Sequence, residues 1–449
     1  MTRRVALFLR THDWGPFARD AATRAAARAV GADVFILADE TRSGPIDAAP
    51  FARIGHTEAD FPALGLPAIH HPSAVMLWWN CDYGILDGIL KQPDYDWYLV
   101  VEDDVAINLD LMGLVDTLAA QGIDAVVSHR PNEIAGWSFA ATMADSDYAR
   151  LVWAPMMVVI LRHAAAVFLV AERRRLAARH AAGEMAAWPF SDGFLPSALL
   201  HGGFVVRPLG DYVDTSRFSA SLIHLASDPA VRAPGAAFHS VLDLEHFWGK
   251  LVSRHYDWML EQARYDDLRG VRAGLLASGQ TSYRGWRVRG PVRLNLALDQ
   301  PARQSSRCGY SRRLLTDAAD PIAVDAAGAV TGFLTGGRQG FHTDHEPAPW
   351  WTVDLGSDRP VAEVWVYNRC HEPDRARAFS VWVAGDGQEW VRAYAKTDGR
   401  VFTGNDDPQV CRFDQTIAAR HVRIQLDLPG YLHLDEVEVF GPLPAYQAS

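Results

Sequence analysis

The sequence predicts an α/β layer followed by an all-β sandwich. In the N-terminal part, continuous apolar runs alternate with segments of helical spacing, which predicts a mostly parallel sheet covered by helices. From about residue 280, short alternating segments rich in β-branched and aromatic residues are separated by turns, which is typical of a sandwich. We therefore expect an α/β domain at 1–279, a linker at 280–294 and a sandwich at 295–449.

The elements of the α/β part follow one another along the chain. Strands are expected at residues 4–10, 32–39, 96–104, 123–129 and 156–161, with helices at 19–30, 77–92 and 109–122. The strands are continuous apolar runs because both faces of a parallel sheet are covered. A helix should follow the strand at 156–161, and residues 191–279 should be helical with short strands.

Composition narrows the class of protein. The chain has 449 residues and a formal net charge of −11, which argues against nucleic acid as the main partner. Its four cysteines are scattered without a CxxC pair, so neither a zinc site nor a dense disulfide framework is expected. Free thiols in a reducing cytoplasm fit best, and one bridge among the last three stays open. The strong apolar stretch after residue 154 is interrupted by Arg162 and His163, so no transmembrane segment is expected.

The expected strand at 96–104 ends in three carboxylates, Glu102, Asp103 and Asp104. Three like charges repel one another unless a cation lies among them. Oxygen ligands suit Mn²⁺ or Mg²⁺, and such an ion can bridge the phosphates of a nucleotide sugar and neutralise the leaving group. Acidic pairs also occur at strand ends without a metal, so the triplet alone is weak evidence.

The segment VMLWWNCDYGILDGILKQPDYDWYLVVEDDV resembles GT-A glycosyltransferases, in which a helix bearing Asn or Asp precedes the DxD strand. The resemblance covers roughly residues 5–239. It implies metal ligation by Asp104 and by Glu102, which replaces the family's first Asp, and completion of the site by a later histidine, for which His239 is the first candidate. An ordinary loop role for His239 is the alternative.

The same resemblance implies a nucleotide-binding set at the strand ends. Its members are Arg10, Thr11, Asp39, Asn80, Asp82 and Asp103. Asn80 and Asp82 would face the ribose or phosphate, and Asp39 the base or ribose. Helix capping for Asn80 and Asp82, and a plain strand-end turn for Asp39, are equally open.

Asp192 follows an aromatic stretch at the start of an expected helix. The family resemblance places an acidic residue there, and an inverting transferase needs a general base to accept the proton of the acceptor hydroxyl. The alternative is a carboxylate that only stabilises the helix N-terminus. A retaining enzyme would need no such base.

The C-terminal segments NLALDQPARQSS and PWWTVDLG resemble discoidin-type (F5/8 type C) domains, and FHTDHEPAPWW with VYNRCHEPDRARAF resembles the F-type lectin branch. That branch binds fucose through a His, an Arg 27 residues later and a second Arg about seven further on. His342 and Arg369 match, since 369 − 342 = 27. Position 376 is Ala376, so the flanking Arg375 and Arg377 are the candidates for the second Arg, and fucose specificity is open.

The lectin resemblance also implies further ligands. Trp350 or Trp351 would cover the apolar face of a sugar, although a place in the sandwich core is the favoured expectation for both and for Trp382. A structural Ca²⁺ would be held by Asp325, Glu436 and the backbone carbonyl of Asp435. Alanines replace the usual Gly and Asn of the calcium loop, which weakens this expectation.

Three functions compete at this point. The first is a metal-dependent glycosyltransferase of bacterial surface polysaccharide synthesis, with a glycan acceptor, peripheral contact with a lipid-linked glycan and its own glycan-binding module. The second is a non-catalytic glycan-binding scaffold with a degenerate transferase domain. The third, a peripheral membrane binder, needs hydrophobic spikes that the pattern does not show. Convergence of Glu102, Asp104 and a distant histidine on one cleft would favour the enzyme.

Overall fold

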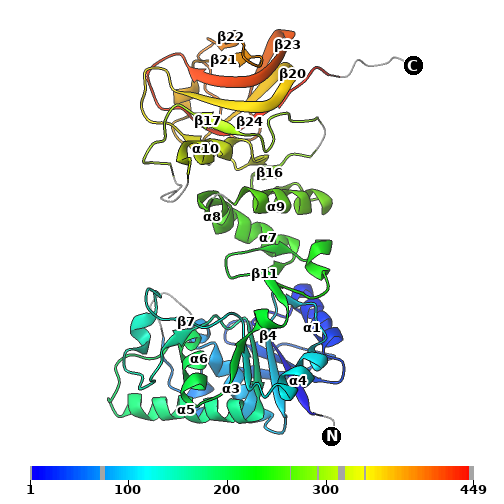
Figure 1. Ribbon diagram of the computed structural model, residues 1–449, viewed down its shortest axis with the longest axis vertical. Coiled ribbons are helices and arrows are strands. Elements are labelled where there is room, and N and C mark those ends of the chain that lie inside the picture. Colours follow the sequence, from blue (N-terminus) through cyan, green and yellow to red (C-terminus); the bar gives the residue numbers. More distant parts are fainter. Residues whose placement is uncertain are drawn as a thin grey trace, which may run out of the picture. The chain divides into compact units, whose positions relative to one another are not determined.

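The protein is described by a computed structural model that covers residues 3–70, 76–262, 264–290, 293–311, 319–337 and 340–443. The chain divides into two compact units, Met1–Asp243 and Leu244–Ser449. Figure 1 shows the elements of each unit along the chain. The units are considered separately below.

The first unit is built on a seven-stranded sheet. Its strands, in spatial order, are β10 (Val206–Pro208), β6 (Ala125–Val127), β9 (Val158–Arg162), β4 (Trp97–Glu102), β1 (Val5–Thr11), β2 (Asp33–Asp39) and β3 (Ala52–His56). Neighbouring strands are parallel except at β9, which runs antiparallel to both β4 and β6. The predicted mostly parallel α/β layer is confirmed, with one reversed strand near its centre.

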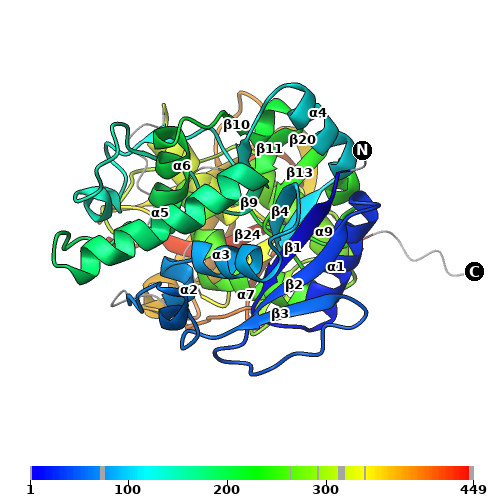
Figure 2. The same ribbon diagram turned by 90° about the horizontal axis from the view of Figure 1, so that it is seen from below.

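Helices cover both faces of this sheet (Figure 2). Successive strand residues point to opposite faces, so Phe8 packs in one core and Leu7 in another. The first core includes helices α3 (Asp82–Lys91), α5 (His163–Ala181) and α6 (Ser191–His201). The opposite face is covered by α4 (Leu111–Ala120) and by α1 (Pro16–Arg28), whose alanines pack on Leu9.

A small three-stranded sheet continues directly from the end of β4. It contains β5 (Val105–Ile107), β13 (Ala236–His239) and β11 (Asp214–Phe218), in the order β11-β13-β5. Strand β13 is antiparallel to β5, with His239 opposite Val105. The backbone N–H of Val241 donates to the carbonyl oxygen of Asp104 at 2.7 Å. This pairing brings residues 236–241 to the acidic end of β4.

The expected helix at 77–92 is interrupted. The structure has α2 (Met76–Trp79) and then α3, with Asn80 and Cys81 between them. The backbone N–H of Cys81 donates to the hydroxyl of Ser191 at 3.2 Å, so a tertiary contact takes the place of a continuous helix here.

The boundary between the units lies earlier than the sequence predicts. Helices α7 (Leu244–Lys250), α8 (Tyr256–Glu261) and α9 (Tyr265–Ala277), with the π-helical turn η5 (Leu251–His255), belong to the second unit. Tyr256 contacts Trp286 and Phe333 at ring distances of 5.0 and 5.4 Å. The expected linker also forms strands, β15 (Ser282–Tyr283) and β16 (Trp286–Val288), which join β18 (Phe333–Leu334). Burial of aromatic rings therefore ties residues 244–290 to the sandwich.

The second unit contains the predicted all-β sandwich. Its larger sheet has the order β19 (Phe341–His342), β24 (His433–Phe440), β20 (Trp350–Asn368), β23 (Gln409–Leu426), β21 (Phe379–Ala384) and β22 (Val391–Lys396), and β17 (Ala302–Gln304) also pairs with β20. All these pairs are antiparallel. Alternate residues, including Val353, Val381 and Val422, form the core.

Short elements complete both units. They are η1 (Phe61–Leu64), β7 (Asn132–Glu133), η2 (Ala140–Met143), β8 (Val152–Trp153), η3 (Leu209–Asp211), β12 (His224–Leu225), η4 (Pro229–Arg232), β14 (Val241–Leu242), α10 (Pro321–Ala326), η6 (Ala327–Ala329) and η7 (Pro373–Ala376). Within the described ranges, every helix is too short or too polar to cross a lipid bilayer. All four cysteines are free thiols.

Candidate functional sites

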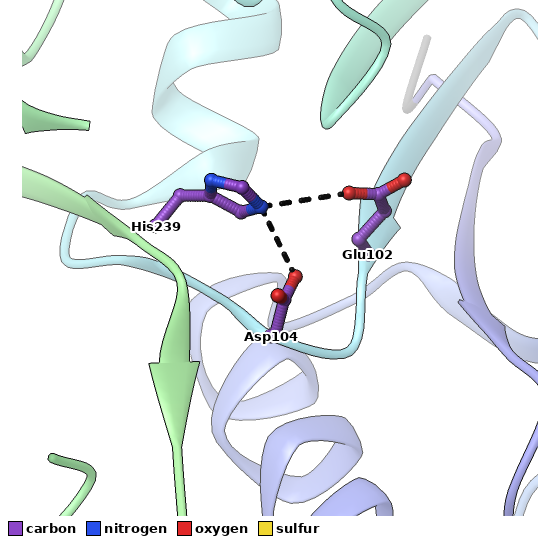
Figure 3. A group of neighbouring side chains, drawn as sticks. All are labelled: Glu102, Asp104 and His239. Carbon is purple, nitrogen blue, oxygen red and sulfur yellow. Dashed lines mark ion pairs between the residues drawn. The ribbon is translucent and has the colours of Figure 1, made fainter. Parts of the chain in front are cut away.

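Glu102, Asp104 and His239 lie together at the carboxyl end of β4 (Figure 3). His239 Nε2 is 3.3 Å from Asp104 Oδ1 and 3.8 Å from Glu102 Oε2. One ligand atom of each residue lies within 4.8 Å of those of the other two. Glu102 is the last residue of β4, Asp104 lies in the turn before β5, and β13 carries His239 back to that turn. The structure thus brings together the three metal candidates of the sequence analysis.

The electrostatics of this cluster follow from its burial and its charges. Burial lowers the pKa of His239, but the hydrogen bond and negative charge of Asp104, followed by the charge of Glu102, outweigh it, and the pKa is raised. Two carboxylates and one imidazole are a donor set that suits Mn²⁺, which accepts both oxygen and nitrogen ligands. The residues present therefore fit a divalent ion, and three protein ligands leave coordination positions for a substrate.

Arg10 and Thr11 at the end of β1, and Asp103 in the turn after β4, lie beside the cluster. Arg10 pairs in register with Glu102, and its guanidinium donates to Glu102 Oε1 at 3.1 Å and to the Met156 carbonyl at 3.2 Å. The Thr11 hydroxyl donates to Asp103 Oδ2 at 2.6 Å. Burial raises the pKa of Asp103 to about 6. Thr11 and Asp103 are therefore hydrogen-bonded to each other. Their contact with a nucleotide stays a prediction.

Asp192 lies at the start of α6, near the same end of the sheet. Its backbone carbonyl accepts from the N–H of Ala154 at 2.9 Å, which anchors the helix start to the chain before β9. Burial, and after it the negative charge of Glu102, raises the pKa of Asp192 to about 7, and Arg10 acts in the opposite sense. The carboxyl group therefore feels the charge of Glu102 and titrates near neutrality. A general base works best with such a pKa.

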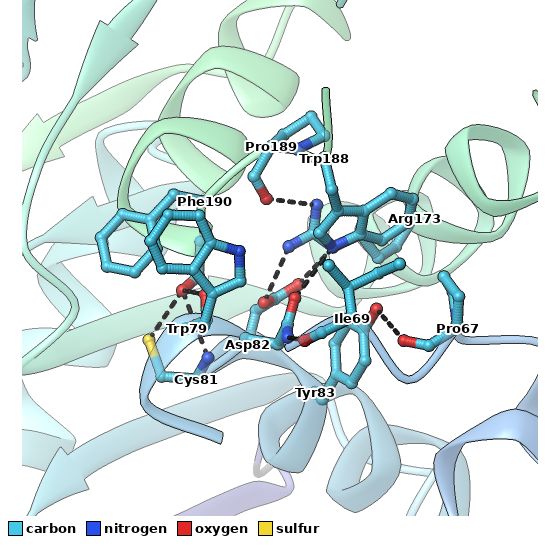
Figure 4. Close-up of polar contacts among 12 residues, drawn as sticks. Pro67, Ile69, Trp79, Cys81, Asp82, Tyr83, Arg173, Trp188, Pro189 and Phe190 are labelled. Atoms are coloured by element: carbon cyan, nitrogen blue, oxygen red, sulfur yellow. Dashed lines mark hydrogen bonds and ion pairs between the residues drawn. The ribbon is translucent and has the colours of Figure 1, made fainter. Parts of the chain in front are cut away.

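Asn80 and Asp82 are structural, which corrects their assignment to a nucleotide site. Asn80 is fully buried, and its amide oxygen accepts from the Trp188 indole at 2.8 Å. The Asp82 side chain is buried, with 1% of the residue exposed, and its carboxylate accepts two hydrogen bonds from Arg173. Nε donates to Oδ2 at 2.8 Å and Nη2 donates to Oδ1 at 3.1 Å (Figure 4). Both carboxylate oxygens of Asp82 are therefore occupied by Arg173. A ribose could bind them only if this ion pair broke, which would leave a buried, uncompensated charge.

Asp39 stands where the sequence places it, at the carboxyl end of β2. Its Oδ1 accepts from the backbone N–H of Thr41 at 3.0 Å, as in a strand-end turn. It is partly exposed. Both expected roles, turn residue and nucleotide ligand, remain compatible with that position, so the nucleotide contact stays a prediction.

The second unit has a pocket of about 600 Å³ that includes the predicted sugar ligands His342, Arg369 and Arg375. His342 is 3% exposed, and its Nδ1 donates to the Thr343 carbonyl at 2.7 Å. Burial lowers the pKa of His342, and the charges of Arg369 and Arg375 act in the same direction. The ring is therefore neutral at pH 7, with two guanidinium groups beside it.

Arg377 does not line this pocket, which decides between the two flanking arginines. Arg377 is exposed, whereas Arg375 stacks over the Tyr431 ring at 5.0 Å and lies 3.7 Å from Glu372. The sequence analysis missed Tyr310, Thr335, Cys370 and Glu372, which also line the pocket. Cys370 and Glu372 lie close to Arg369 in the sequence, and this could have indicated that they line the pocket. Tyr310 and Thr335 come from distant segments, and the sequence gives no indication of their place in it.

The tryptophans of the sandwich separate into two groups. Trp351 is fully buried and its indole N–H donates to the Ala326 carbonyl at 2.9 Å, so the expected core position is confirmed for this residue. Trp350 and Trp382 alternate with core residues on β20 and β21 and are only partly buried. The expectation of a core position is wrong for these two, which lie on the outer face of the sheet.

The candidate calcium ligands are buried and accept hydrogen bonds from the chain itself. Asp325 receives the Gln304 amide at 2.8 Å, and Glu436 receives the backbone N–H of Gly332 at 2.8 Å. Burial raises the pKa of Glu436 well above its usual value. The Asp435 side chain accepts from the N–H of Thr335 at 2.9 Å. Calcium binding by this set stays a prediction.

His433 gives the second unit a pH-dependent stability. It is 1% exposed, lies 5.1 Å from the His342 ring, and burial followed by the charge of Arg369 lowers its pKa to about 2. In the unfolded chain this histidine binds a proton below about pH 6.5, whereas in the folded chain it stays neutral. Its full contribution to the free energy of unfolding is therefore present above that pH and is lost progressively as the pH is lowered. Between pH 7 and pH 5 we expect a loss of ~2 kcal/mol from this residue.

Urea unfolding at the two pH values measures this loss, with His433→Gln as the comparison. The glutamine variant lacks the titrating group, so its free energy of unfolding should change less between pH 7 and pH 5 than that of the parent. An equal pH dependence in both proteins would contradict the assignment to His433.

Comparison with known proteins identifies a known domain family in the second unit. The F5/8 type C domain model matches residues 320–436. The second unit therefore contains an F5/8 type C, or discoidin-like, domain, and the predicted class of the sandwich is confirmed. None of the curated proteins matches the chain.

Several solved structures are similar to about a third of the chain. The lectin domain of lectinolysin, complexed with Lewis B antigen, is 27% identical over 33% of this chain and 98% of its own, with a TM-score of 0.27. A Streptococcus pneumoniae fucose binding module is 27% identical over 34% and 99%, with a TM-score of 0.26. A fucolectin from Morone saxatilis (striped bass) serum is 24% identical over 35% and 50%, with a TM-score of 0.27.

Proposed function

We propose that the first unit transfers a sugar from a nucleotide-sugar donor to a glycan acceptor with the aid of Mn²⁺ or Mg²⁺, and that the second unit binds a glycan. The observation that carries the first part is the convergence of Glu102, Asp104 and His239 on the end of a central strand. In open α/β sheets, ligands bind at the carboxyl ends of the parallel strands. A non-catalytic scaffold has no need of two carboxylates and a histidine in one place.

Each residue of the site has a defined task in this proposal. Glu102, Asp104 and His239 hold the ion, which when bound neutralises the charge of the donor diphosphate. Arg10 is fixed by the Met156 carbonyl and orients the carboxylate of Glu102. Asp192 accepts the proton of the acceptor hydroxyl if the reaction inverts the configuration.

Slow hydrolysis of the donor tests the transferase proposal without knowledge of the acceptor. The full chain is incubated with a panel of nucleotide sugars and Mn²⁺, and release of the nucleoside diphosphate is measured. We expect release from at least one donor that depends on Mn²⁺ and is lost in Asp104→Ala. Failure of every donor, or release that Asp104→Ala retains, would leave the glycan-binding scaffold as the better description.

The glycan-binding part rests on the pocket of the second unit. A neutral imidazole and two guanidinium groups, from His342, Arg369 and Arg375, offer hydrogen bonds to neighbouring hydroxyl groups. The ring of Tyr431, over which Arg375 stacks, adds an aromatic surface nearby. Such a polar, exposed site is expected to bind weakly, at roughly millimolar to micromolar dissociation constants.

Replacement of Arg369 by alanine should remove the binding of neutral glycans to the pocket of His342 and Arg369 and leave the fold intact. The side chain supplies hydrogen bonds at the pocket surface and is not part of the apolar core. Glycan-array binding by the full-length chain is the measurement. Arg377→Ala is the matched control, since it removes the same charge from an exposed position outside the pocket lining. A silent array, with a lowered melting temperature in Arg369→Ala, would indicate a purely structural arginine.

A further inference from the structure

The outer face of the sandwich carries a row of aromatic and basic side chains. In register across the strands, Thr352 of β20 faces Arg423 of β23, and Arg423 faces Trp382 of β21. Arg392 of β22 continues the row beyond Trp382. The residues next to Thr352, Arg423 and Trp382 along β20, β23 and β21, such as Val422, are buried in the core, whereas Val391 beside Arg392 is exposed. The alternation of a strand therefore directs the members of this row away from the core.

Arg423 is enclosed by two indole rings. Its guanidinium carbon lies 4.6 Å from the centre of the Trp350 ring and 4.0 Å from that of Trp390. Both rings are only partly buried. Stacking of this kind uses the flat faces of a guanidinium and leaves its N–H groups, which lie in the plane, for another partner.

That partner is not supplied by the part of the chain that the structure describes. Among the described residues Arg423 has no ion pair, and its buried Nε has no hydrogen bond. Burial without a compensating carboxylate lowers the pKa of Arg423, although an arginine keeps its charge. The carboxylate of Asp354, on the same face of β20, is already held by Arg420 at 2.8 and 2.9 Å. A buried donor without an acceptor is costly in a folded protein.

We propose that this face is a second saccharide site, separate from the pocket of His342 and Arg369, and that it binds a pyranose bearing a carboxylate, as in the uronic acid residues of an acidic polysaccharide. A guanidinium is the side chain best matched to a carboxylate, since both are planar and can form two parallel hydrogen bonds. Trp350 and Trp390 flank that position with aromatic surface for the apolar face of a sugar ring. The positive charge of Arg392 favours the same anionic ligand.

The proposal is tested with tetragalacturonate and its methyl ester, which have the same sugar rings but differ in charge. Binding to the full-length chain is followed by calorimetry and by tryptophan fluorescence. We expect the acid to bind at least about tenfold more tightly than the ester, because the ester cannot form the bidentate ion pair. Equal affinities, or no binding of the acid, would overturn the proposal.

Three variants locate the site. Arg423→Gln should weaken tetragalacturonate binding at least tenfold, and Arg423→Lys, which keeps a cation between the two indoles but loses the planar fork, should weaken it as well. Arg369→Ala should leave this binding within about twofold. If Arg423→Lys folds normally and binds as the parent does, or if Arg369→Ala abolishes binding, the carboxylate site is not on this face.

Discussion

Asp192→Asn should reduce turnover on the order of 10³-fold while donor binding is kept. The substitution preserves the size of the side chain and its place at the start of α6 but removes its ability to accept a proton. General bases contribute roughly 10²- to 10⁴-fold to a reaction. Single-turnover transfer and calorimetric binding of the nucleoside diphosphate, measured on the same preparation, separate the two effects.

Asp145→Asn is a suitable control for Asp192→Asn. Asp145 accepts from the backbone N–H groups of Ala186 and Ala187, shortly before α6. It is partly exposed and does not belong to the cluster of Glu102, Asp104 and His239. Turnover in this control should stay close to that of the parent. Near-normal transfer by Asp192→Asn would mean that the enzyme retains configuration or uses another base.

Asp104→Ala should lower the affinity for Mn²⁺ by more than about 100-fold, since changes of groups that only support a metal ligand already cost 10- to 100-fold. Titration of Mn²⁺ alone, followed by the electron paramagnetic resonance signal of the free ion, measures this without any substrate. The loss should extend to Mn²⁺-dependent binding of a nucleoside diphosphate.

The matched control for Asp104→Ala is Asp116→Ala on α4, which removes an exposed carboxylate that pairs with Arg3. Its Mn²⁺ affinity should equal that of the parent. Because Asp104 lies in a turn rather than in the core, the melting temperature of Asp104→Ala should change little. Equal Mn²⁺ binding in both variants would exclude Asp104 as a ligand.

Much of the first unit could be predicted because its signals are local. The apolar run of β4 and the carboxylates after it are adjacent in the sequence, so the position of Glu102 and Asp104 at a strand end followed from the pattern alone. The place of His239 did not follow from any local signal. It depends on the pairing of β13 with β5, and the family resemblance alone suggested this histidine.

The errors concern residues whose partners lie far away in the sequence. Asp82 was expected to be either a nucleotide ligand or a residue of a helix start. It is the first residue of α3, and Arg173 of α5 reaches it inside the core, which leaves no room for the nucleotide role. Trp350 looked like a core residue, but the strand phase places Trp351 inside and Trp350 outside. Neither the partner of a charge nor the phase of a strand is fixed by composition, so the structure was needed for both.

The pairing of β5 with β13 makes the cluster of Glu102, Asp104 and His239 sensitive to strand length as well as to residue type. His239 faces the turn of Asp104 only while it stays opposite Val105. A slip by one residue in a strand reverses the direction of every side chain. A single-residue insertion or deletion within β13, before His239, would turn the imidazole away and keep all three residues in the sequence. Homologues that retain Glu, Asp and His but differ in length within this strand should therefore not bring the three side chains together.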